Sequence, residues 1–401
     1  MKKIFPKKNA YILLLIAMML VGIGFLVMMM VVDAFPLNVV LGFIALLLIM
    51  LGLTSVLCSR DKKGLRITGI VIAALFILIY GLGTYYLTTT YSMFARISTD
   101  KYETSASASS VDVTEDSFNV YITGIDQWAK EKGMDLERSD VNMIMTVCPK
   151  TRKITLTSIP RDAYVPLHRT GTMDKLTHTG IYGVDETLNT VHDWTGLDLN
   201  YYVKVNFTAC VGIIDAIGGV DVYSPVAFSS AISKYSYDEG WNHLDGKAAL
   251  FFARERKAFN EEDQLRVKNQ LRVIKAMLNK LLSSKTLLTS YGELMSVISD
   301  DMETNMPVSD IQALVKMQMA DLSKWDIKMQ RMSGDYMMAV VASMDSRNQY
   351  QVLDINDKTF NSCINNINKT MNPTAAEIAK ATADRQKSSM LSFLRGLKGK
   401  K

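Results

Sequence analysis

The sequence has few of the residues that metal clusters and disulfide frameworks require. Its 401 residues include only four cysteines and four histidines. The cysteines are far apart in sequence and form no CxxC pair, and no histidines have HExxH spacing. These counts argue against a zinc cluster and against a fold held together by many disulfides.

A large excess of one charge is also missing. Lysine and arginine total 45 against 40 aspartates and glutamates, which leaves a net charge of +5. This mild balance, without a helix-turn-helix pattern, gives no reason to expect nucleic-acid binding. Hydrophobic residues make up 48% of the chain, which is ample for a sizeable core.

The apolar residues are concentrated near the N-terminus. Three long runs cover residues 11–32, 37–57 and 67–86. Each has about the 20 residues that a helix needs to cross a bilayer. A signal peptide would have a shorter apolar run and would not be followed by two more. We therefore expect a membrane region at residues 1–88 with three transmembrane helices.

Basic residues near these runs predict the orientation. They precede the first run and fill the second loop: Lys2, Lys3, Lys7, Lys8, Arg60, Lys62, Lys63 and Arg66. The first loop carries only Asp33. Because lysine and arginine mark the cytoplasmic side, the N-terminus should be cytoplasmic and the chain after the third run extracellular. An enzyme placed there has no ATP and must take its driving energy from its substrate.

The remaining chain divides by composition. Residues 89–116 are rich in Ser, Thr and Ala and predict a polar extracellular linker, and residues 372–401 predict a polar, basic and disordered tail. Between them, residues 117–371 alternate strand-like segments such as "FNVYITGID" and "KITLTSI" with helical ones. This alternation predicts an α/β domain with a mixed central β-sheet flanked by helices.

Charged residues occur at the ends of two predicted strands. Arg138 and Asp140 lie just before "VNMIMTV", and Arg161 and Asp162 follow Pro160 directly after "KITLTSI". The ends of strands are where open α/β sheets bind ligands. A surface ion pair and a solvated turn are the simpler interpretations of the same residues.

The segment "FFARERKAFNEEDQLRVKNQ" poses a similar choice. Arg254 and Arg256 can point the same way only if a helix has ended there, since residues two apart on a helix do not share a face. Asp263, Arg266 and Gln270 have spacings of three and four, which place them on one face of the next helix. Taken alone, the segment fits a solvated helix face; combined with the strand-end charges, it fits a phosphate site with a divalent cation.

Several longer segments then resemble the LytR-CpsA-Psr family of cell-wall ligases. They are "ITGID", "RSDVNMIMTVCPKTRKITLTSIPRDAYV", "DKLTHTGIYG", "YYVKVNF", "IIDAIGGVDVYSP", "HLDGKAALFFARER" and "DQLRVKNQLRVI". They occur in the family's order over about residues 118–282. The three apolar runs look like those of the CpsA-type members.

The resemblance implies a function. Such enzymes transfer a glycan, as glycosyl phosphate, from undecaprenyl pyrophosphate to peptidoglycan in Gram-positive envelopes, and the glycan can be capsule, teichoic acid or a similar polymer. By position in the motifs, Asp126 and Asp140 would bind Mg²⁺, with Mn²⁺ as an alternative. The implied pyrophosphate-binding residues are Arg138, Arg161, Lys175, Arg254, Arg256, Arg266 and Gln270. Arg161, Asp263 and Arg266 would be catalytic, and Asn269 departs from the arginine that many members have there.

Two other functions remain open on the sequence. The chain could bind polyprenyl-pyrophosphate polymers as a regulator without turnover. It could also hydrolyse the prenyl pyrophosphate, with water as the acceptor. The two predicted metal carboxylates favour catalysis over pure binding, but the acceptor depends on the shape of the site.

Overall fold

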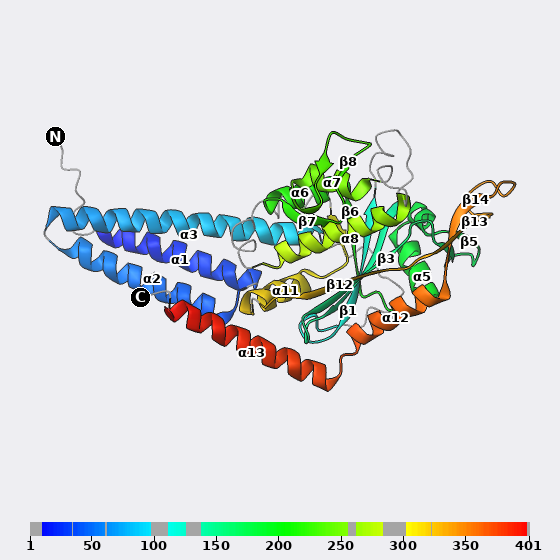
Figure 1. Ribbon diagram of the computed structural model, residues 1–401. Coiled ribbons are helices and arrows are strands. Elements are labelled where there is room, and N and C mark those ends of the chain that lie inside the picture. The colour runs from blue at the N-terminus through cyan, green and yellow to red at the C-terminus, as the bar shows by residue number, and fades with distance from the viewer. Residues whose placement is uncertain are drawn as a thin grey trace. The chain divides into compact units, whose positions relative to one another are not determined.

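The computed structural model describes residues 10–33, 35–60, 62–97, 111–125, 138–255, 262–283, 302–321 and 323–398. The chain forms two compact units (Figure 1). One comprises residues 1–95 with 311–321, and the other comprises residues 96–310 with 322–401.

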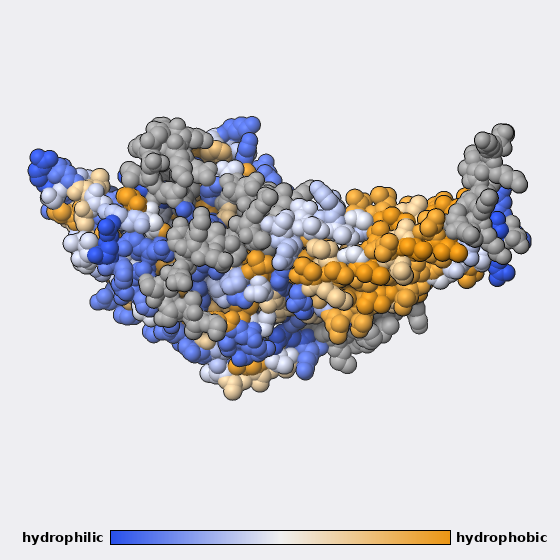
Figure 2. Space-filling model, turned by 180° about the vertical axis from the view of Figure 1, so that it is seen from behind, coloured by the Kyte–Doolittle hydropathy of each residue, from blue (hydrophilic) through white to orange (hydrophobic). Residues whose placement is uncertain are grey.

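The first unit contains the three predicted apolar helices. They are α1 (Ala10–Val32), α2 (Leu37–Ser59) and α3 (Lys63–Ile97), and each is long and apolar enough to cross a membrane. Large apolar side chains such as Leu13 and Leu37 are about 70% exposed, at 69% and 70%. Figure 2 shows these helices as a broad apolar surface. Exposing such a large apolar surface to water costs free energy, whereas lipid acyl chains can cover it without that cost.

The third helix is longer than its apolar run. The sequence predicted a span ending at residue 86 and a polar linker from residue 89, yet α3 remains helical to Ile97. Thr84, Thr88 and Thr89 lie inside this helix, where each donates a hydrogen bond to the carbonyl four residues earlier. The polar composition that predicted a linker therefore begins inside a helix.

The second unit is built on a six-stranded mixed sheet in the order β11-β6-β1-β2-β3-β12. Its strands are β1 (Phe118–Ile125), β2 (Ser139–Cys148), β3 (Lys153–Ile159), β6 (Tyr201–Asn206), β11 (Met302–Thr304) and β12 (Asp326–Arg331). β1 pairs with β6, and β3 with β12, in parallel, while the other pairs are antiparallel. The predicted α/β class with a mixed sheet is confirmed.

The register defines two edges of this sheet. Ile125 pairs with both Asn206 and Ser139, so β1 and β6 end where β2 begins. β3 and β12 end at the same edge, since Arg331 pairs with Ser158. We call this the carboxyl edge. The opposite edge, where β3 begins at Lys153 and β12 at Asp326, is the amino edge.

Helices cover both faces of the sheet. On one face, α5 (Val184–Thr195) and α12 (Asp357–Met371) pack on a buried cluster that includes Tyr121 and Ile144. On the other face lie α6 (Phe207–Ala216), α7 (Gly246–Arg254) and α8 (Glu262–Leu281). The smaller elements are β4 (Tyr164–Pro166), β5 (Met173–Lys175), η1 (Leu176–Tyr182), β7 (Val220–Ser224), β8 (Phe228–Ser229), β9 (Ser236–Tyr237), β10 (Gly240–Leu244), α11 (Val308–Ala320), β13 (Gly334–Ala339) and β14 (Tyr350–Ile355).

The C-terminal segment differs from its prediction. Residues 372–401 were expected to be disordered, but α13 (Ala375–Lys398) is a helix. Its start is a capping box: the Glu377 amide donates to Thr374 Oγ1 at 3.3 Å, and the Thr374 amide donates to Glu377 Oε2 at 3.0 Å. Glu377 Oε1 also accepts from Lys153 Nζ at 2.9 Å, which joins the helix to the amino edge. The polar composition of this segment led to the wrong prediction, although its capping box is a signal for the start of a helix.

Candidate functional site

The turn after β3 places Arg161 at the carboxyl edge. Pro160 begins this turn, and the Ala163 amide donates to the Pro160 carbonyl at 3.0 Å. The Arg161 carbonyl accepts from the Thr177 amide at 2.8 Å, so η1 holds the turn from the other side. Two segments that are separate in sequence thus fix the backbone of the predicted arginine.

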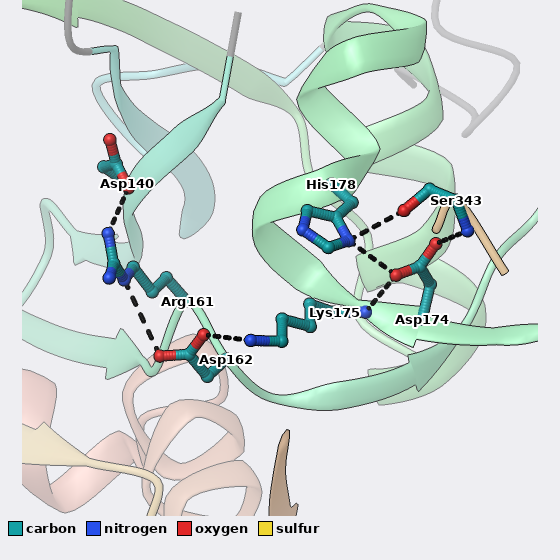
Figure 3. Close-up of polar contacts among 7 residues, drawn as sticks. All are labelled: Asp140, Arg161, Asp162, Asp174, Lys175, His178 and Ser343. Atoms are coloured by element: carbon teal, nitrogen blue, oxygen red, sulfur yellow. Dashed lines mark hydrogen bonds and ion pairs between the residues drawn. The ribbon is translucent and has the colours of Figure 1, made fainter. Parts of the chain in front are cut away.

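Four charged side chains extend in a row from this turn, with alternating signs (Figure 3). Arg161 Nη1 lies 2.6 Å from Asp140 Oδ1, and Arg161 Nε lies 3.6 Å from Asp162 Oδ2. Asp162 Oδ1 in turn lies 3.1 Å from Lys175 Nζ. These side chains are between 17% and 30% exposed, so they are screened less than surface pairs. The structure therefore brings together three predicted site residues, Asp140, Arg161 and Lys175.

An apolar cavity opens between the sheet and the helices α6, α7 and α8. Its lining residues are Ile122, Gly124, Val141, Val205, Phe207, Cys210, Ile214, Gly246, Ala249, Leu250, Ala253, Arg254, Gln270, Val273 and Ile274. Burial raises the pKa of Cys210 to about 11, so its thiol stays neutral at pH 7. Among the described residues of this lining, Arg254 is the one that is charged and Gln270 is the one with a side-chain amide.

Arg254 lies where α7 ends, as the spacing of the arginines predicted. Glu255 already has an extended backbone, with φ −66° and ψ 131°. The Arg254 guanidinium carbon lies 5.1 Å from the centre of the Phe207 ring. Phe207 directly follows the end of β6, so this contact places Arg254 near the carboxyl edge. Two predicted pyrophosphate residues, Arg254 and Gln270, therefore share one cavity.

Close packing of the helices gives this cavity its shape. A Cβ on Gly246 would lie 2.2 Å from the Val211 carbonyl oxygen, so only glycine lets α7 approach α6 this closely. A Cβ on Gly124 would lie 2.9 Å from Val141 Cβ. Both glycines line the cavity.

The sequence departure at Asn269 has a structural role. Asn269 is 1% exposed, and its Oδ1 accepts from Arg272 Nη1 at 2.7 Å. Its Nδ2 donates to the Phe252 carbonyl at 3.4 Å. Asn269 therefore joins α8 to the last turns of α7, beside Gln270.

The remaining predicted site residues are placed to different degrees. Arg138 is exposed and directly precedes Ser139, where β2 begins. Asp263 and Arg266 belong to the first two turns of α8, and their side chains lie outside the described part of the structure. Asp126 and Arg256 also lie outside the described residues. Within the described ranges, no three His, Cys, Asp or Glu side chains are placed to hold a metal ion.

A buried cluster of three polar residues, Asp174, His178 and Ser343, lies next to Lys175. Asp174 Oδ1 lies 2.7 Å from His178 Nδ1, which is also 2.8 Å from Ser343 Oγ (Figure 3). The Ser343 amide donates to Asp174 Oδ2 at 2.8 Å. Burial would raise the pKa of Asp174, but the hydrogen bonds from His178 and Ser343 outweigh it, and the pKa is lowered.

Sequence reasoning gave no role to several of these residues. Asp162 bridges Arg161 and Lys175, and Phe207 lies under Arg254. The sequence analysis placed Asp162 at a strand end without a specific role, although an aspartate directly after a strand-end arginine is available to pair with it. The contact of Ser343 with His178 joins residues 165 positions apart, which no local pattern indicates.

Comparison with known proteins agrees with this geometry. The sequence model of the LytR_cpsA_psr family matches residues 84–369, well over half of the chain. The chain belongs to the LytR-CpsA-Psr family. This match includes β1, β2, β3, α7 and α8, and hence both the row of charges and the apolar cavity.

Named relatives of this LytR-CpsA-Psr chain are transferases. It is 33% identical over 278 residues to "Polyisoprenyl-teichoic acid--peptidoglycan teichoic acid transferase TagU" of Bacillus subtilis, covering 67% of this chain and 88% of that protein. The Bacillus licheniformis protein of the same name is 32% identical over 259 residues, covering 63% and 81%. A solved structure, "TagT bound to LIIa-WTA", is 25% identical with a TM-score of 0.53, covering 68% of this chain and 98% of that one.

Proposed function

We propose that this chain is a membrane-anchored phosphotransferase that attaches a wall glycopolymer to peptidoglycan. It would take the polymer, as glycosyl phosphate, from a polyprenyl pyrophosphate carrier. The relatives named as teichoic acid transferases support a polymer of that class. The observation that carries the proposal is the apolar cavity with Arg254 and Gln270 in its lining, because it sets an apolar surface beside phosphate-binding groups.

The two parts of the donor suit two parts of the site. A prenyl chain has only carbon and hydrogen, and the cavity offers it side chains such as Ile122, Val205 and Ile274. The pyrophosphate would lie at the carboxyl edge, where guanidinium groups bind phosphate oxygens in pairs. Arg161 and Arg254 would provide these contacts, with Arg138, Arg256, Arg266, Lys175 and Gln270 around them.

The expected divalent cation fits the residues at this edge. Asp140 offers a carboxylate directly at the start of β2, and Asp126 follows the end of the neighbouring strand β1 in sequence. Mg²⁺ commonly takes one or two carboxylates and completes its shell with phosphate oxygens and water. When bound, it would neutralise part of the charge on the pyrophosphate. Asp140 already holds Arg161 at 2.6 Å, so metal and arginine would meet the donor together.

The chemistry forms one bond and breaks one. The acceptor hydroxyl oxygen of peptidoglycan bonds to the glycan-linked phosphorus, and the bond from that phosphorus to the bridging oxygen breaks. Prenyl phosphate leaves, and the hydroxyl proton is lost. The arginines would stabilise the charge that builds up on the phosphates. Asp263 would orient Arg266 or receive the proton, and cleavage of the pyrophosphate supplies the energy.

The membrane helices give this reaction its location. Three membrane-crossing helices keep the enzyme at the surface where a prenyl-linked donor is found. The positive residues of the N-terminus and the second loop support an orientation in which those segments are cytoplasmic and the catalytic unit is outside. The acceptor lies on that same outer side.

The test measures the release of prenyl phosphate by the full chain in nanodiscs, with Mg²⁺ and a prenyl-pyrophosphate glycan. Arg161→Ala and Asp140→Ala should each lower the rate by about 10²–10³-fold. Arg347→Ala is the matched control, since Arg347 is 88% exposed and, among the residues that the structure describes, its ion pair is with Asp345, two positions away. Full turnover by both site variants would contradict the proposal.

Adding peptidoglycan separates the alternatives. Polymer attached to peptidoglycan is the expected product. Free phosphorylated polymer as the sole product would identify a hydrolase. Tight donor binding without turnover would identify a regulator.

A further inference from the structure

The two halves of α13 differ in composition and in contacts. The first half begins at the Thr374–Glu377 capping box and is attached to the amino edge through the Glu377–Lys153 ion pair. Lys380, Asp384 and Arg385 continue along a charged cavity at the amino edge. Through these contacts, the first half of α13 is docked on the amino edge of the sheet.

The second half has a different sequence pattern. Asp384 is the last acidic residue of the chain, and six basic residues follow: Arg385, Lys387, Arg395, Lys398, Lys400 and Lys401. The same stretch contains large apolar residues: Met390, Leu391, Phe393, Leu394 and Leu397. The backbone is helical through Lys398. Residues three and four apart share a helix face, and Met390, Phe393, Leu394 and Leu397 have that spacing.

An apolar face with abundant lysine and arginine is typical of a helix that lies in a membrane interface. Two observations favour the bilayer over another occupant. The charge is complementary, because anionic lipids attract basic segments by about 1 kcal/mol per residue. The bilayer would also be near, because the same chain carries three helices that are long and apolar enough to cross a membrane. A tethered segment binds at a high effective concentration even when its own affinity is weak.

We propose that the second half of α13 lies in the interface of an anionic membrane, with the helix face that holds Met390, Phe393, Leu394 and Leu397 toward the acyl chains. The catalytic unit is then attached to the bilayer at two places, through α3 and through its C-terminal helix. A second attachment limits the rotation of the unit above the membrane. The inference does not depend on the proposed reaction.

The first experiment compares two positions on α13 in the full chain. Met390→Cys and Ser388→Cys carry a polarity-sensitive fluorophore, in nanodiscs of phosphatidylglycerol mixed with phosphatidylcholine. These positions are two apart and point to nearly opposite sides of a helix. Quenching by nitroxide-labelled lipid should be strong at 390 and weak at 388. The chain without an added cysteine, labelled in the same way, gives the background from its native thiols.

The second experiment changes the lipid and the charge. In nanodiscs of phosphatidylcholine alone, quenching at 390 should fall. Each change of Lys387, Arg395 or Lys398 to Gln should weaken membrane partitioning roughly fivefold, equivalent to about 1 kcal/mol. Lys369→Gln, in the last turn of α12, is the matched control and should change nothing. Equal quenching at 388 and 390, or no quenching at either position, would overturn the proposal. Quenching at 390 that does not change with lipid charge would also overturn it. Energy transfer between two labelled chains would instead point to a second copy of the chain as the occupant.

Discussion

The two edges of the central sheet both carry ion pairs and a cavity, but their physical character differs. At the carboxyl edge, the pair of Asp162 and Lys175 is 19% and 17% exposed, and the nearby cavity is lined almost entirely by carbon. At the amino edge, the pair of Lys153 and Glu377 is 34% and 44% exposed, and the cavity is lined mainly by charged side chains.

This difference distinguishes the carboxyl edge, as a ligand-binding site, from the amino edge, as a structural contact. Placing partly buried charges beside an apolar surface costs free energy, so the arrangement indicates a ligand that interacts with both. A lipid with a charged head group would contact the charges and the apolar surface. Exposed charges of both signs are screened by water and mainly fix the docking of α13. Chemistry should therefore depend on the carboxyl edge, and the amino edge should affect only stability.

The largest expected effect in this comparison is on the buried cluster of Asp174, His178 and Ser343, next to Lys175 at the carboxyl edge. Asp174→Asn should lower the free energy of unfolding of the catalytic unit by about 2 kcal/mol, because it removes the charge from two buried hydrogen bonds. Ser343→Ala should cost about half as much, since it removes only the contact of Ser343 Oγ with His178, while Asp174 keeps both His178 and the Ser343 amide. Thermal unfolding of the full chain in detergent measures both. A change in Asp174→Asn no larger than in Ser343→Ala would show that the carboxylate is not needed there.

The second expected effect concerns the length of the prenyl chain. Ala253→Phe places a ring in the apolar cavity, and excluding about two methylene groups would cost roughly tenfold in kcat/KM. The loss should be larger for long-chain than for short-chain donors, so the ratio of the two kcat/KM values is the measurement. Ala381→Phe in the charged cavity is the matched control. An equal change in this ratio in both variants would remove the distinction between the cavities.

These comparisons also show how far the sequence could predict the molecule. The strands β1, β2 and β3 follow from their alternating apolar patterns, and Arg161 follows from its position after a strand. The pairing of Asp162 with Lys175, 13 residues apart, depends on the turn from β4 to β5, which no local motif specifies. The contact of Arg254 with Phe207 depends on the packing of α7 against α6. The helix α13 was missed because composition outweighed the Thr374–Glu377 capping box, although that signal is local and readable.

The smallest expected effect is at the amino edge and depends on pH. The hydrogen bond from Lys153, with those from Thr374, lowers the pKa of Glu377 from 4.5 to about 2. A carboxyl whose pKa is lower in the folded chain stabilises it above its unfolded pKa, and this contribution is lost as the pH falls through the folded value. Glu377→Gln should therefore have a slightly lower Tm than the parent chain at pH 6, and the two values should converge between pH 4.5 and 2. Because the pair is well exposed, the difference should also shrink in high salt, and prenyl phosphate release should be unchanged. A loss of turnover in this variant would mean that the amino edge takes part in the chemistry and that the two edges are coupled.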